Sequence, residues 1–87
     1  MKSSLSSEVY IVAEQVVRLV YPPALSNVPV INRLIRNYND LSVNIIRADT
    51  SSTQAWLECQ LVGSPGLIEG AIDWLRGQGI EVQTLGA

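Results

Sequence analysis

Histidine is absent from this 87-residue sequence, and Cys59 is its single cysteine. A catalytic thiol needs a neighbouring base, and zinc or iron–sulfur sites need several histidine or cysteine ligands. The sequence also lacks a glycine-rich phosphate-binding motif. We therefore expect no catalytic residues, no metal site, no cofactor and no enzymatic activity. Since one cysteine forms no disulfide within the chain, a reducing compartment, the cytoplasm, is the expected location.

Charged residues are scarce as well. They make up 16% of the sequence, the net charge is −2, and the six basic residues do not cluster. Nucleic-acid binding depends on clustered cations, so nucleic acid is not an expected partner. Apolar runs extend over only a few residues, whereas a helix that crosses a bilayer needs about 20, so no direct membrane insertion is expected. With 47% hydrophobic residues, the chain can bury one two-layer core.

Two kinds of periodicity alternate along the chain. Apolar residues recur at every second position in four segments, which is typical of strands, and at helical spacing in two others. Ser26 or Asn27 is expected to cap the first helix, and Ser64, followed by Pro65, the second. The expected strands cover residues 15–21, 41–48, 54–62 and 80–85, and the expected helices cover residues 29–38 and 65–76.

The two halves of the sequence repeat each other. The apolar positions of both helices, and those of the strands that follow them, correspond at one constant offset: Leu34 matches Ala71, and Val43 matches Ile80. Two strand-helix-strand units of this kind predict an α+β, ferredoxin-like β-α-β-β-α-β fold, a four-stranded antiparallel sheet with two helices on one face. We assign it to residues 14–87. Residues 1–13 are expected to be an N-terminal extension, partly flexible or an added strand.

The alternation also divides the side chains between the two faces of the sheet. The predicted core between sheet and helices comprises Leu19, Leu34, Ile35, Val43, Ile45, Leu57, Leu61, Ile72 and Leu75, with Cys59 also inward. The outward face carries several apolar side chains among Arg18, Asn44, Glu58 and Gln60, and a large exposed apolar patch usually marks an interface. We predict that Val16, Val20, Ile46 and Trp56 form this interface and that the chain is a homodimer. In the alternative, residues 1–14 fold over this face.

Asn44 lies among β-branched residues in the strand at 41–48, where asparagine is disfavoured. Because a half-buried amide without hydrogen bonds costs about 1–3 kcal/mol, its side chain is expected to bond to the backbone, a second subunit or a ligand. The residues alone leave two interpretations open: a satisfied structural amide at the end of a strand, or a ligand contact.

Three segments resemble the NIL domain family: Val43-Asn44-Ile45-Ile46, Ala71-Ile72-Asp73-Trp74-Leu75 and Gly79-Ile80-Glu81-Val82. The family is named for its Asn-Ile-Leu motif, here Asn44-Ile45-Ile46, and the similarity covers residues 14–86. It is best known as the C-terminal domain of the ATPase subunit of bacterial methionine importers. The resemblance implies a ferredoxin-like fold, dimerisation and, as in the transporter members, methionine binding near the dimer interface.

The residues and the resemblance together favour a non-enzymatic regulatory domain that senses a methionine-like amino acid at or near a dimer interface. The expected ligand-binding residues are Asn44, Ile45, Ile46 and Arg47. A free amino acid needs partners for both of its charges, and these are expected to be Asn44 together with Arg47 or Arg18. The alternative function is a protein-interaction adaptor that docks an unidentified cytoplasmic protein through the open sheet face or an edge strand, without a small ligand.

Overall fold

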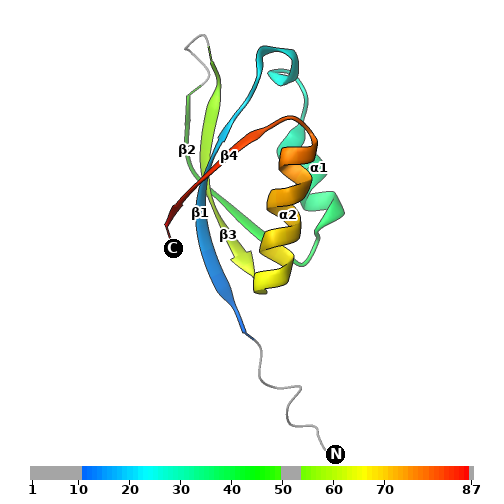
Figure 1. The fold of residues 1–87 in the computed structure, drawn as a ribbon, viewed down its shortest axis with the longest axis vertical. Coiled ribbons are helices and arrows are strands. Elements are labelled where there is room, and N and C mark those ends of the chain that lie inside the picture. The colour runs from blue at the N-terminus through cyan, green and yellow to red at the C-terminus, as the bar shows by residue number, and fades with distance from the viewer. Residues whose placement is uncertain (1–10, 50–53, 87) are drawn as a thin grey trace, which may run out of the picture.

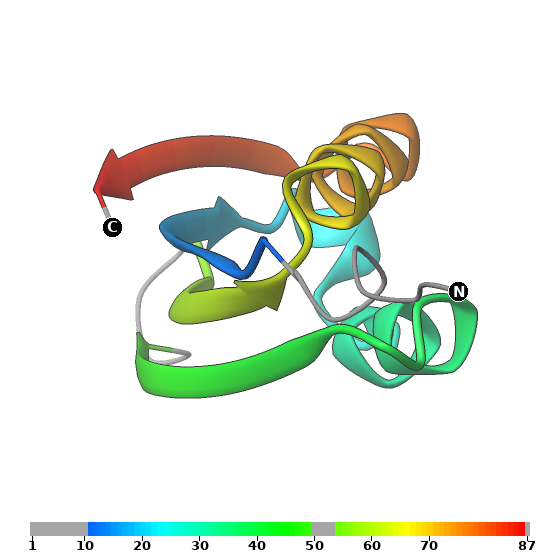
Figure 2. The ribbon, with the colours of Figure 1, turned by 90° about the horizontal axis from the view of Figure 1, so that it is seen from below.

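A four-stranded antiparallel sheet carries two helices on one of its faces, while no helix of the described residues lies on its other face (Figures 1 and 2). This computed structural model describes residues 11–49 and 54–86. The strands lie in the order β2-β3-β1-β4, which makes β2 and β4 the edges. The α+β, ferredoxin-like fold is thereby confirmed. The elements are β1 (Ala13–Val20), the 3₁₀ turn η2 (Pro23–Leu25), α1 (Val30–Asn37), β2 (Ser42–Asp49), β3 (Trp56–Gly63), α2 (Pro65–Gly77) and β4 (Glu81–Gly86). The prediction for residues 1–13 lies outside the described residues except at Ile11, Val12 and Ala13.

The ends of α2 follow the local sequence. Ser64 is the N-cap, and its hydroxyl accepts a hydrogen bond from the Leu67 N–H at 3.2 Å, as predicted. At the other end Gly79 has a φ of +94°, and the Ile80 N–H reaches back to the Leu75 carbonyl at 3.1 Å. This arrangement is a Schellman motif, in which the left-handed position favours glycine because a Cβ there is strained.

The start of α1 differs from the prediction. Its N-cap is Pro29, which makes no side-chain hydrogen bond, so the assignment of the cap to Ser26 or Asn27 is wrong. Ser26 instead closes η2, where its hydroxyl donates to the Pro23 carbonyl at 3.0 Å. The physical reason is that the Pro22-Pro23 pair initiates a turn of its own, which uses this serine before α1 begins.

The core lies between the helices and the central strands. Of the predicted core residues, Leu19, Leu34, Leu61, Ile72 and Leu75 are buried, and Val43 and Leu57 pack against them from half-buried positions. Cys59 is fully buried in the same cluster, which confirms its inward position.

Ile35 and Ile45, by contrast, are 43% and 58% exposed, so their assignment to the core is wrong. Both lie on the β2 side of the molecule, where few helix residues pack against the sheet. The eight-residue helix α1 buries only Val30 and Leu34, whereas the longer α2 buries four residues. A short helix therefore leaves the inward side of the edge strand partly open.

A β-bulge interrupts strand β2. Asn44 pairs with Gln60 and Ile45 with Cys59, but the next pair is Arg47 with Glu58, which leaves Ile46 as an extra residue. The predicted alternation therefore holds from Val43 to Ile45 and then shifts by one position. As a consequence Arg47 shares the helix-free face of the sheet with Asn44.

Candidate functional site

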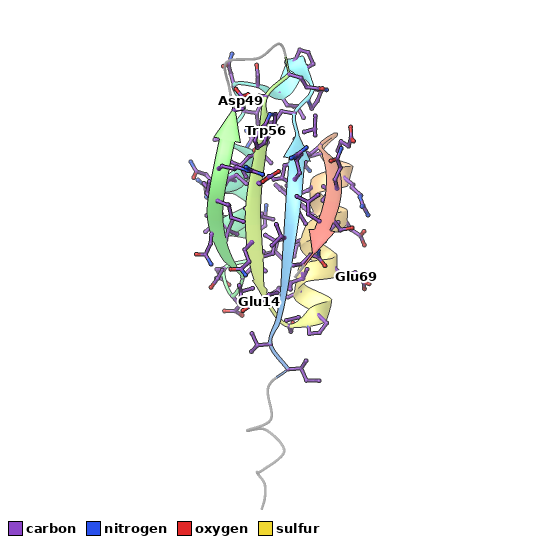
Figure 3. The ribbon with its side chains drawn as sticks, turned by 90° about the vertical axis from the view of Figure 1, so that its left-hand side faces the viewer. Glu14, Asp49, Trp56 and Glu69 are labelled. Atoms are coloured by element: carbon purple, nitrogen blue, oxygen red, sulfur yellow. The ribbon has the colours of Figure 1, made fainter. Side chains whose placement is uncertain are left out.

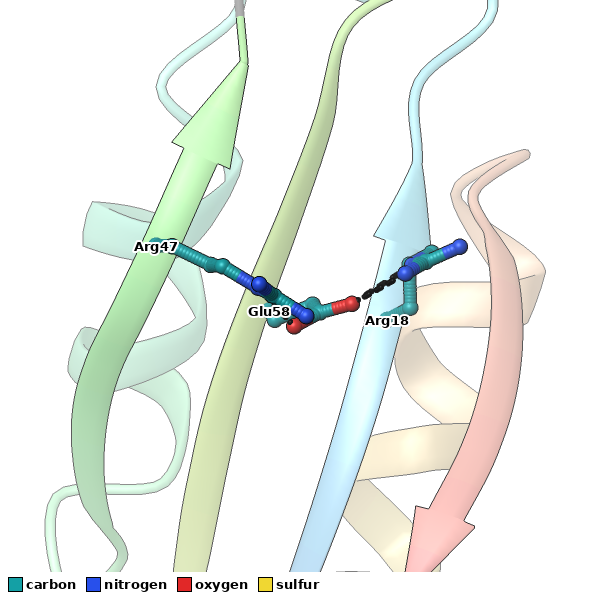
Figure 4. A network of polar contacts seen from close by, with 3 residues as sticks. All are labelled: Arg18, Arg47 and Glu58. Atoms are coloured by element: carbon teal, nitrogen blue, oxygen red, sulfur yellow. Dashed lines mark hydrogen bonds and ion pairs between the residues drawn. The ribbon is translucent and has the colours of Figure 1, made fainter.

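Two arginines and one glutamate occupy the middle of the helix-free face (Figure 4). Arg47 on β2 donates from Nε to Glu58 Oε1 at 2.6 Å, and Arg18 on β1 donates from Nε to Glu58 Oε2 at 2.8 Å. The Nη2 of Arg18 also bonds the same Oε2. Each carboxylate oxygen of Glu58 on β3 is thus held by a different arginine, and the three side chains connect three adjacent strands.

The two guanidinium groups also change the environment of Glu58. Although no helix covers this face, the residue is only 4% exposed. The hydrogen bond from Arg47 and then that from Arg18 lower the pKa of the Glu58 carboxyl below its ordinary value, against the smaller opposing effect of desolvation. Glu58 is therefore an ionised bridge at neutral pH.

Arg18 is restrained from a second side. Its guanidinium carbon lies 4.9 Å from the centre of the Trp56 ring, within the range of a cation–π interaction. Figure 3, which looks onto this face, places Trp56 near the β2–β3 turn and Glu14 near the opposite end of the strands. Arg47 has no comparable restraint, and its side chain is 66% exposed. Among the described residues, the bond from its Nε to Glu58 is the one that its guanidinium group makes.

Asn44 is exposed on the same face and makes no side-chain hydrogen bond to any described residue. The premise of a half-buried amide is therefore wrong, because water can satisfy the group at no burial cost. The strand pairing brings it into the row next to Arg47: Asn44 lies opposite Gln60, Arg47 lies opposite Glu58, and side chains two residues apart on β3 share a face. The amide and the guanidinium are thus neighbours across the bulge.

The remaining sequence-predicted residues divide into two groups. Val16, Val20 and Trp56 share the helix-free face, with Val20 directly opposite Trp56, and all three are half-buried. Ile45 and Ile46 lie on the edge strand β2, Ile45 opposite Cys59 on the helix side and Ile46 at the bulge, and both are more than half exposed. The face is less apolar than the sequence suggested, because the Arg18–Glu58–Arg47 network occupies its middle.

Glu58 is the residue at this site that the sequence reasoning missed. Its alternation with Leu57 and Cys59 placed it correctly on the outward face, next to Trp56 and Gln60. Its partners depend on the register of three strands, and the bulge in β2 turns Arg47 towards it.

The described residues offer little other chemistry. Burial raises the pKa of the Cys59 thiol to about 11, which keeps it protonated and unreactive. Among residues 11–49 and 54–86, no group of three or more cysteine, aspartate or glutamate side chains could hold a metal ion. In the same part of the chain, no helix has the length and apolar character needed to cross a membrane.

Comparison with known proteins identifies the class of this fold and then the family. The chain is a ferredoxin-like domain, and it is similar to the C-terminal domain of an ABC transporter ATP-binding protein from Enterococcus faecalis, with a TM-score of 0.70 and 26% identity over 83% of each chain. The NIL domain profile matches residues 15–84, so the chain belongs to the NIL domain family. The de novo designed protein Foldit4 shares the fold alone, at 11% identity and a TM-score of 0.60 over 88% of this chain and 99% of its own. No curated protein matches the chain significantly.

Proposed function

We propose that this chain is a non-enzymatic regulatory domain of the cytoplasm that binds a small amino acid, methionine-like in its side chain, on strand β2. Membership of the NIL family and the likeness to a transporter ATPase domain support a regulatory role. The observation that carries the site is that the bulge brings Asn44 and Arg47 onto the same face of an exposed edge strand, where no helix of the described residues covers them.

The chemistry of the two side chains suits a free amino acid. The Nη groups of Arg47 can form a bidentate pair with the ligand carboxylate, because its Nε already holds the guanidinium against Glu58. The Asn44 carbonyl oxygen can accept from the ligand ammonium. Ile46, the extra residue of the bulge, supplies apolar surface beside them for a thioether or alkyl side chain, whereas Ile45 lies opposite Cys59 on the other face of the strand.

A second copy of the chain would complete this shallow site. We propose a homodimer in which the β2 edge and the helix-free face, with Val16, Val20, Ile46 and Trp56, lie at the subunit interface. Association of two copies would pair the free edge of β2 and bury its exposed isoleucines, and both effects favour a dimer. In sedimentation across a concentration series, we expect twice the chain mass of 9.5 kDa. A mass that stays at 9.5 kDa at high micromolar concentration would refute the interface.

Titration calorimetry tests the ligand. Each standard amino acid is titrated at millimolar concentration, and we expect heat from one or a few apolar ones, methionine among them. Asn44→Ala should weaken binding by about tenfold or more, which corresponds to the loss of one good hydrogen bond. Asn39→Ala, at an exposed asparagine in the turn before β2, is the matched control and should bind normally. No heat with any amino acid, or equal affinity of Asn44→Ala and the unmodified chain, would overturn the proposal.

The exposed edge of β2 also favours a second candidate, a protein-interaction adaptor. An extended segment of another protein could add to this edge by β-augmentation, with Ile45 and Ile46 as apolar contacts. A cytoplasmic partner retained in stoichiometric amount by the unmodified chain and lost with Ile46→Glu, together with no response to amino acids, would favour the adaptor over the sensor.

A further inference from the structure

A cavity of about 240 Å³ lies beside the start of α1, and residues 44–47 of the proposed amino-acid site are not part of its lining. It lies where the loop after β1 and the start of α1 meet the end of β2 and the residues around the start of β3. Its walls are Tyr21, Ser26, Val28, Pro29, Val30, Ile31, Asn32, Ala48, Ala55, Trp56 and Leu57. Three separate parts of the chain therefore enclose it.

The lining has a consistent chemistry. Most of it is aliphatic or aromatic, and among the described residues none that lines the cavity is charged. The uncharged polar groups are the hydroxyls of Tyr21 and Ser26 and the amide of Asn32. The Tyr21 hydroxyl makes no hydrogen bond to a described residue, and desolvation raises its pKa, so it is a protonated donor at neutral pH. Such a lining offers hydrogen bonds but nothing to neutralise an ion.

We propose that this cavity is a binding site for a small uncharged molecule with a body of about one ring and a single polar group. An apolar cavity of roughly 150 Å³ is large enough for benzene, so 240 Å³ accommodates a substituted ring. A zwitterionic amino acid does not suit the site, because burying its two charges without partners is costly. The proposal does not depend on the amino-acid site on β2, and the failure of either proposal leaves the other unaffected.

The probes are p-cresol and L-tyrosine, which share a phenol ring but differ in the charges that tyrosine carries. Backbone amide signals of the unmodified chain are followed by NMR during titration with each compound. We expect p-cresol to cause saturable shifts at Tyr21, Val30, Ile31 and Ala48, whereas tyrosine leaves these signals unchanged. Calorimetric heat from amino acids, if observed, reports on the β2 site and does not enter this test.

Three leucine substitutions complete the experiment. Ala55→Leu fills the cavity from the start of β3 and should weaken p-cresol binding by about tenfold or more, since the ring and the leucine compete for one volume. Ala48→Leu fills it from β2 and gives a second reading should Ala55→Leu fail to fold. Ala24→Leu, at an exposed position of η2 outside the lining, is the matched control and should bind p-cresol normally.

The proposal is overturned if p-cresol gives no saturable shifts up to about 10 mM, a weak limit for a ligand of this size. It is equally overturned if tyrosine shifts the same signals as strongly, or if a folded Ala55→Leu or Ala48→Leu chain binds p-cresol as well as the Ala24→Leu control.

Discussion

Leu75 offers the sharpest test of the packing, because its side chain on α2 is completely buried. Leu75→Ala removes three carbon atoms, which is about 2.4 kcal/mol of lost transfer free energy at about 0.8 kcal/mol per methylene. The cavity left behind adds to this cost, so we expect the free energy of unfolding to fall by about 2–5 kcal/mol. In a domain of this size, that loss lowers the melting temperature by roughly 10 °C or more.

Leu85→Ala is the matched control, since this leucine at the end of β4 is 48% exposed. The same atoms are removed there, but much of the side chain is already in water, so the loss should stay below about 1 kcal/mol. Urea melts at one temperature, followed by circular dichroism, give both free energies. A loss for Leu75→Ala no greater than that for Leu85→Ala would refute the placement of the α2 stripe against the sheet.

Two further predictions concern the charged network and the end of α2. The arginines lower the pKa of the Glu58 carboxyl in the folded chain below its ordinary 4.5. The network therefore stabilises the fold at pH values above 4.5, and this contribution is lost as the pH falls through the lowered pKa. Urea melts at about pH 7 and about pH 3 should therefore show a larger acid-induced loss for the unmodified chain than for Glu58→Gln, and equal losses would contradict the network. Gly79→Ala should cost about 1 kcal/mol because φ is +94° there, whereas Gly77→Ala, where an added Cβ meets nothing within 4 Å, should be neutral or stabilising. Thermal melts of both glycine variants decide this, and equal stability would show that the left-handed conformation is not required.

The network also connects the family motif to the rest of the sheet. β2 is an edge strand with mostly exposed residues, so its position depends on the ladder to β3 and on the Arg47–Glu58 ion pair. Glu58 in turn bonds Arg18 on the central strand β1. A ligand carboxylate on Arg47 would therefore act at one end of a chain of contacts that reaches the middle of the sheet.

Local patterns in the sequence determined most of the architecture. Alternating side chains defined the strands and their faces, including the outward positions of Arg18 and Glu58, and Ser64 followed by Pro65 defined the start of α2. These features were predictable because they depend on residues close together in the chain, whose backbone preferences and hydrogen bonds form within one turn or one strand.

Tertiary structure alone decided how β2 presents its side chains. The bulge at Ile46 arises from pairing with β3, and it moves Arg47 from the side of Ile45 to the side of Asn44. The exposure of Ile35 and Ile45 depends on how little of the sheet the short helix α1 covers. The cavity between the α1 start and the β2–β3 hairpin likewise exists only where three distant segments meet. Strand register, the area of sheet that a helix covers and the position of cavities are set by contacts between segments far apart in the chain. No local periodicity encodes them.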